Sequence, residues 1–87
     1  MSRNNQFQHR FASTIGEYPR ATEAVKHGVN IGIRAGVAGA HEIVPRTPAP
    51  GDAVGDPVTV DMLQGETLAV DVAEVHATPG KYHILYA

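Results

Sequence analysis

The histidines and the carboxylates near them are the residues of this 87-residue chain that could hold a metal ion. Glu74 and His76 stand two positions apart, and such residues share one face of a strand. His83 follows the turn Thr78-Pro79-Gly80, so it comes near His76 in some registers of the flanking strands. Two histidines and a carboxylate, with His41 as a further ligand, can hold zinc or iron. The sequence therefore offers one candidate metal or small-ligand site.

The same strand face also has a structural explanation. Leu68, Val70 and Val72 share the parity of Glu74 and His76, so the face begins as core. Strand ends commonly run out of a core into solvent, where polar side chains need no ligand. On this interpretation we expect no metal ligand and no cofactor.

The sequence carries little else that could do catalysis. It contains no Cys, which excludes disulfides, thiolate metal sites and cysteine nucleophiles. The serines, Ser2 and Ser13, lie in the first 18 residues, a segment with poor means of holding a nucleophile in place. The Gly-rich residues 28–39 follow no phosphate-binding spacing. We expect no catalytic residue, and no enzyme.

The net charge of −2 is the sum of two opposite halves. Residues 1–50 hold six Lys or Arg and three Glu, whereas residues 51–87 hold one Lys and six Asp or Glu. Such a division can orient a protein on a charged partner or let one copy meet the next head to tail, although simple scatter also explains it. Because the basic residues form no cluster, we expect no nucleic-acid partner. No segment has the about 20 apolar residues of a membrane span, and no leader is visible, so we expect no membrane.

Residues 1–18 differ in pattern from the rest. After a polar start, Phe7, Phe11, Ile15 and Tyr18 recur at intervals of four, four and three. These intervals fit a helix face, and the first three positions fit a strand equally well. Gly16 and Pro19 leave room only for a short helix, which is marginal alone in water. We expect an arm that docks through aromatic anchors flanked by Arg, or whose aromatic side chains complete the core of the body. The candidate partner-binding residues are Arg3, Phe7, Arg10, Phe11, Ile15 and Tyr18.

The pattern of residues 19–87 predicts one small β-domain. A short helix is predicted for residues 20–27, ended by Gly28. Alternating apolar residues predict strands over 29–34, 41–44, 58–63, 67–76 and 81–87, with 58–63 and 67–76 as a hairpin around Gln64-Gly65. The Pro-rich residues 45–57 predict a loop. The predicted fold class is mainly β: a small antiparallel barrel or sandwich with one short helix and an extended N-terminal arm.

The run Gly51-Asp52-Ala53-Val54-Gly55-Asp56-Pro57-Val58-Thr59-Val60 resembles the Gly-Asp-rich turn and strand of tailed-phage capsid decoration (cement) proteins. The resemblance covers about residues 51–70. It implies a structural protein of the virion, a compact β-domain with an N-terminal arm that sits on the capsid surface as an oligomer, often a trimer. It also implies a partner, the major capsid protein or another large assembly. Without this resemblance a cytoplasmic location is expected.

Small size supports the expectation of association. Cys-free domains of this length have a marginal core, and their open sheet edges can pair with a neighbour. We therefore expect a homo-oligomer whose arm adds to an adjacent subunit. Two other interpretations stay open: a small metal- or ligand-binding β-domain that uses His41, Glu74, His76 and His83, and an accessory subunit of an enzyme complex.

Overall fold

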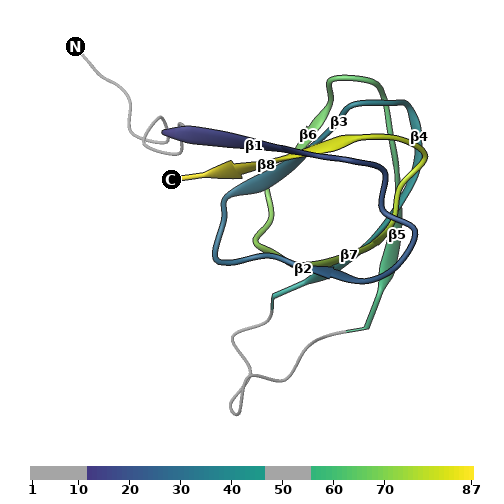
Figure 1. The fold of residues 1–87 in the computed structure, drawn as a ribbon, viewed down its shortest axis with the longest axis horizontal. Helices are drawn as coiled ribbons and strands as arrows, with labels where there is room; N and C mark the ends of the chain where they lie inside the picture. The colour runs from purple at the N-terminus through teal and green to yellow at the C-terminus, as the bar shows by residue number, and fades with distance from the viewer. Residues whose placement is uncertain (1–11, 47–55) are drawn as a thin grey trace.

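The computed structural model describes residues 12–46 and 56–87, and these residues form two antiparallel β-sheets (Figure 1). The first sheet has the order β1-β8-β3-β6 and the second sheet the order β2-β7-β4-β5. The mainly β prediction is confirmed. The strands are β1 (Thr14–Tyr18), β2 (Val25–Lys26), β3 (Gly32–Ala35), β4 (Gly39–Pro45), β5 (Val58–Met62), β6 (Thr67–Leu68), β7 (Val72–Ala77) and β8 (Tyr82–Tyr86).

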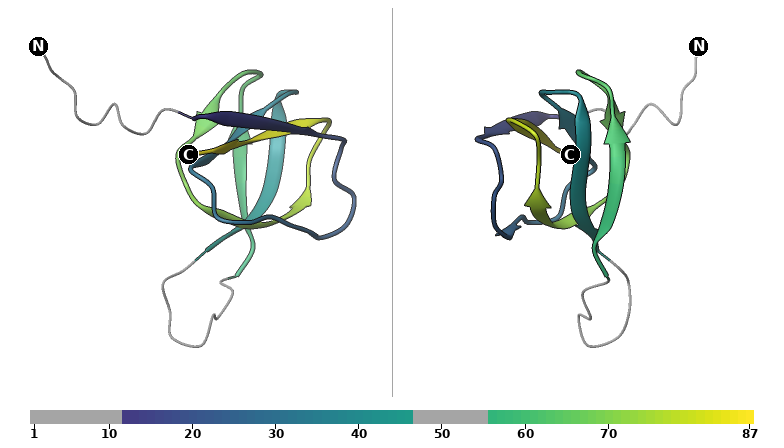
Figure 2. Two further views of the ribbon diagram at one scale, coloured as in Figure 1. Left: turned by 60° about the vertical axis from the view of Figure 1, so that its left-hand side comes forward. Right: turned by 90° about the vertical axis from the view of Figure 1, so that its right-hand side faces the viewer.

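The chain passes repeatedly from one sheet to the other, and the two sheets wrap around a shared interior (Figure 2). Only β4 and β5 follow each other in the same sheet, among the strands described. The interior is filled from both sides by fully buried side chains, each of which contributes about 1.5–3 kcal/mol on burial. They are Ile33, Tyr82 and Ile84 from the first sheet and Ile43, Val72 and Val75 from the second.

Strand β8 explains why the two-residue periodicity was informative. It lies between β1 and β3. Its residue Tyr82 pairs with Tyr18 of β1 and Ala35 of β3, and its residue Ile84 pairs with Gly16 of β1 and Ile33 of β3. Tyr82 and Ile84 point inward and are buried, as the alternation predicts for this strand. A central strand needs a buried face along its whole length, and the alternating apolar side chains of residues 81–87 form that face.

The short helix predicted for residues 20–27 is wrong. Within the described residues this segment contains no helix: it bends at Thr22 and Glu23, and then forms β2, where Val25 pairs with Val75 and Lys26 with Glu74. Two turns of helix are marginal on their own, so tertiary hydrogen bonds decide the conformation. The amide of Ala21 donates to Thr78 Oγ1 at 2.9 Å.

The hairpin predicted for residues 58–63 and 67–76 is also wrong. Strand β5 pairs with β4, β6 pairs with β3, and β7 pairs with β2 and β4. The turn at Gln64-Gly65 does exist, with Gly65 at a φ of +83°, but it carries the chain from one sheet into the other. Periodicity specifies which face of a strand is buried and leaves its partner open.

The β-domain extends further toward the N-terminus than residue 19. The end of the predicted arm forms β1, which pairs along its five residues with β8. This part of the chain is therefore an extended edge strand of the first sheet. Residues 1–11 lie outside the described residues.

Candidate functional site: the β1 edge and the adjoining pocket

The predicted metal ligands lie on three different strands. On β7, His76 Nε2 is 2.8 Å from Glu74 Oε1, so these two side chains do share one face. His83 is on β8 in the other sheet, where its Nε2 is 3.7 Å from Glu17 Oε2. His41 is fully buried on β4, and its Nδ1 donates to the carbonyl of Gly39 at 2.9 Å.

The structure does not bring these residues together as one site. The turn after β7 leads into the opposite sheet, so β7 and β8 are not paired with each other. Within residues 12–46 and 56–87, no group of three or more His, Cys, Asp or Glu side chains could hold a metal ion. Of the four predicted ligands, only Glu74 and His76 contact each other in the described residues.

Strand β1 is an open edge of the first sheet. Among the described strands it pairs only with β8, so the backbone N–H and C=O groups on its other side pair with no described strand. Its side chains alternate: Tyr18 points toward the interior, and Ile15 and Glu17 point outward. Ile15 is half exposed, and Glu17 Oε2 is 3.1 Å from Lys81 Nζ.

The inward side chain of β1 joins an aromatic cluster of Tyr18, His27, Tyr82 and Tyr86. The Tyr18 ring stacks on Tyr82, with centroids 5.4 Å apart, and its hydroxyl is 2.7 Å from that of Tyr86. His27 meets Tyr18 and Tyr82 edge-on, and its Nε2 is 2.8 Å from the Tyr82 hydroxyl. Tyr18 thus packs against its own domain in the structure.

Burial shifts the pKa of three side chains in the aromatic cluster, in each case toward the neutral form. Burial raises the pKa of Tyr82 to about 12, with smaller contributions from Tyr18 and Tyr86. Burial and the hydrogen bond with Tyr18 likewise raise the pKa of Tyr86 to about 12. Burial lowers the pKa of His27, which favours its neutral form. A tyrosine with so high a pKa is poorly matched to proton transfer near neutral pH.

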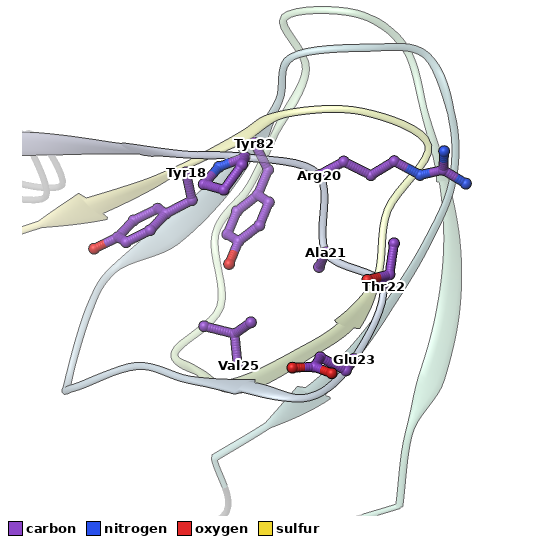
Figure 3. Close-up of a pocket in the computed structure, with 8 residues that line it drawn as sticks. Tyr18, Arg20, Ala21, Thr22, Glu23, Val25 and Tyr82 are labelled. Atoms are coloured by element: carbon purple, nitrogen blue, oxygen red, sulfur yellow. The ribbon is translucent and has the colours of Figure 1, made fainter.

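A pocket of about 340 Å³ adjoins the end of β1 (Figure 3). This volume is near the lower end of the range for small-molecule sites, about 300–1,000 Å³. The pocket has apolar surface from Ala21, Val25 and the Tyr82 ring, while the exposed Arg20 and Glu23 border it. In Figure 3 the Arg20 side chain points away from this space; its Nε donates to the Thr78 carbonyl at 3.2 Å. The full lining is Tyr18, Pro19, Arg20, Ala21, Thr22, Glu23, Val25 and Tyr82.

The structure places two of the predicted partner-binding residues. Ile15 is exposed on the outer face of β1, and Tyr18 lines the pocket. Arg3, Phe7, Arg10 and Phe11 lie outside the described residues. The contacts of Tyr18 with Tyr82 and His27 have no signal in the sequence, because the pairing of β1 with β8 brings Tyr82 to it and the turn of the chain into β2 brings His27.

Comparison with protein-family models, curated proteins and solved structures gave no match to this chain. In the part of the chain that the structure describes, no helix has the length and apolar character needed to cross a membrane.

Proposed function

We propose that this chain is a structural assembly protein, a capsid decoration (cement) subunit that binds and stabilises a larger shell through its arm and its sheet edges. The observation that supports this most is the open edge of β1, which leads directly into the N-terminal segment. That segment carries Phe7 and Phe11 with Arg3 and Arg10 near them, and Ile15 on β1 continues its apolar series. Aromatic anchors with Arg are the residue types that dominate interface energetics.

The energetics favour attachment of many copies to one large partner. Burial of Phe7, Phe11 and Ile15 would contribute about 1.5–3 kcal/mol each. Association costs about 4–15 kcal/mol of lost freedom before any surplus remains. One arm therefore binds weakly, whereas copies linked to one another on a repeating surface gain from high effective concentration. The proposed partner is the major capsid protein or another large assembly of this kind, with the subunit on the outside of the virion.

The test uses particles of the virus whose genome encodes this chain, prepared with and without it. We expect the full chain to co-sediment saturably with the deficient particles and to raise their disruption temperature. Replacement of both Phe7 and Phe11 by Ala should weaken binding by roughly 100-fold or more, since each 1.4 kcal/mol is a factor of ten. Val29→Ala, at a side chain that is 76% exposed in the body, should bind as the unchanged protein does. Particles that neither contain nor bind the chain would refute the proposal.

The contact between Glu74 and His76 supports a second candidate function, that of a small metal- or ligand-binding β-domain. Metal analysis of the purified protein and its melting temperature with added zinc distinguish the two. For a cement subunit we expect sub-stoichiometric metal and no thermal shift. A zinc-dependent rise in melting temperature that disappears in His76→Ala would favour the metal-binding function instead.

A further inference from the structure

Two strands of equal length lie at open edges of the two sheets. Strand β1 ends the first sheet and β5 ends the second, and each has five residues. Among the described strands, β1 pairs only with β8 and β5 only with β4. The right-hand view of Figure 2 shows β1 (purple) and β5 (green) on opposite sides of the body. The other end strands of the described sheets, β6 and β2, have only two residues each, so β1 and β5 are the two long edges, and they face away from each other.

The charges around the two edges are complementary. On the outer face of the first sheet, Glu17 lies opposite His83 in β8, which lies opposite Arg34 in β3. Beside β1 itself, Lys81 contacts Glu17 and Arg20 follows the strand, so two cations lie near the one carboxylate of β1.

The β5 edge has the opposite sign. Asp61 lies within β5, Asp56 precedes it, and Glu42 of β4 lies opposite Thr59. Residues 47–80 contain no Lys or Arg at all. The cations beside β1, Lys81 and Arg20, and the carboxylates at β5 therefore attract each other between copies.

Exposed aliphatic side chains coincide with the same edges. Ile15 on β1 is 50% exposed, Val58 on β5 is 43% exposed, and Leu63 just after β5 is 72% exposed. Single exposed aliphatic residues are ordinary on protein surfaces. Their position on strands with free backbone groups makes these edges suited to pairing with another strand.

From these observations we infer that β1 of one copy pairs with β5 of the next copy, head to tail. The inference rests on the proposed function and names how its subunits join. Antiparallel pairing over the full five residues places Glu17 opposite Thr59, whereas parallel pairing would place Glu17 opposite Asp61. Like charges directly opposite are destabilising, so the antiparallel arrangement is the one favoured. Because the two edges differ, the interface is heterologous and continues into a ring or an open chain.

Disulfide trapping tests this pairing, because the natural sequence has no Cys. Glu17→Cys and Thr59→Cys change exposed side chains at positions that the antiparallel pairing places opposite each other. We expect a disulfide-linked dimer when the two single variants are mixed, and little product from either alone. The chain that carries both changes should give a ladder of multimers on a non-reducing gel. Val29→Cys, at an exposed position away from both edges, measures random collision when mixed with Thr59→Cys.

The charges provide a second measurement. Asp61→Lys reverses the sign at the β5 edge, and we expect it to slow cross-linking of the mixed variants at least tenfold while the melting temperature of the isolated subunit is kept. Cross-linking of Glu17→Cys alone at the rate of the mixture, or no product above the Val29→Cys control, would overturn the inference. If the chain binds to particles but gives no ladder of multimers, the edge pairing is rejected and the proposed function stands. A ladder without binding to particles would reject the shell partner alone.

Discussion

At the scale of single residues, two buried polar side chains join segments that are distant in sequence. The Asn30 amide donates to the carbonyls of Gly28 and Val72 and accepts from the amide of Val72. Thr78 Oγ1 accepts from the amide of Ala21 and donates to the carbonyl of Gly80. Both residues are buried with their hydrogen bonds made, so each fixes a connection outside the regular strand ladders.

Asn30→Ala should destabilise the domain strongly. The change leaves the amide and the carbonyl of Val72 without their Asn30 partners, and each unsatisfied buried group costs about 1–3 kcal/mol. We expect the free energy of unfolding in urea to fall by about 2–4 kcal/mol. The neighbouring exposed Val29→Ala should change it by no more than about 0.5 kcal/mol. Equal stability of the two variants would show that the amide bridge contributes little.

His27 should make stability depend on pH. Burial lowers its pKa in the folded state below the ordinary 6.5, so at mildly acidic pH the unfolded chain binds more protons. The stability that neutral His27 contributes is complete above pH 6.5 and is lost as the pH falls below it. Gln in its place can keep a hydrogen bond to Tyr82 without titrating.

The measurement is the free energy of unfolding of the natural protein and of His27→Gln between pH 8 and pH 5. The other histidines titrate in both proteins, so the difference between the two isolates His27. We expect this difference to decrease as the pH falls. A difference that stays constant would assign the pH dependence to other groups.

At the scale of elements, β1 has a double role. Its inward side contributes Tyr18 to the core, and its free side is available to a partner. The sequence spacing placed Ile15 and Tyr18 on one face, since residues three apart share a helix face. On a strand the same spacing puts them on opposite faces, which is why Tyr18 packs inside and Ile15 is exposed.

Two truncations separate these roles. Removal of residues 1–11 leaves β1 and its pairing with β8 in place, so we expect the melting temperature to change little. Removal of residues 1–18 takes away Tyr18 and exposes β8, and should cost at least about 3 kcal/mol, as for other large aromatic truncations. Thermal and urea unfolding report both effects. If the shorter truncation were as damaging as the longer one, residues 1–11 would be part of the domain core.

The pairing of β3 with β6 requires a residue without a side chain at Gly32. A Cβ at Gly32 would lie 2.8 Å from the backbone oxygen of Leu68, whereas a Cβ at Gly28 would meet nothing within 4 Å. Gly32→Ala must push β6 away, and we expect a loss of about 1–3 kcal/mol in unfolding free energy. Gly28→Ala is the matched control and should be near neutral. A neutral Gly32→Ala would mean that β6 moves without cost.

The elements also show how far the sequence could predict this fold. Alternation along residues 81–87 correctly predicted β8 and the burial of Tyr82 and Ile84. It could not specify that β5 and β6 belong to different sheets, because the period is the same whichever strand lies alongside. The cluster around His27 was beyond prediction for the same reason, since residues 27, 18 and 82 meet only through the pairing of β1 and β8 and the turn of the chain into β2.

At the scale of the whole molecule, association should stabilise the fold. Binding of one native copy to another removes native monomer from the unfolding equilibrium, so the melting temperature rises with protein concentration. Above the dissociation constant we expect the melting temperature to rise by about 6–11 °C for each tenfold increase in concentration, since a tenfold change is about 1.4 kcal/mol. Differential scanning calorimetry at several protein concentrations measures this rise in melting temperature, and sedimentation measures the association. The Asp61→Lys variant should lose this dependence, and a concentration-independent melting temperature in the natural protein would contradict the prediction.

The central position of β8 in the first sheet also affects how the protein is made. Strands β1 and β3 both pair with β8, although more than 45 residues separate β3 from it in the sequence. Contacts between residues so distant in sequence form slowly, because a long loop must close before any pairing is gained. While the ribosome still holds β8, β1 and β3 have no strand between them, and their apolar faces stay uncovered. Folding of this domain is therefore expected to wait until β8 has left the exit tunnel, and until then the nascent chain presents unpaired strands to chaperones and to other copies of itself.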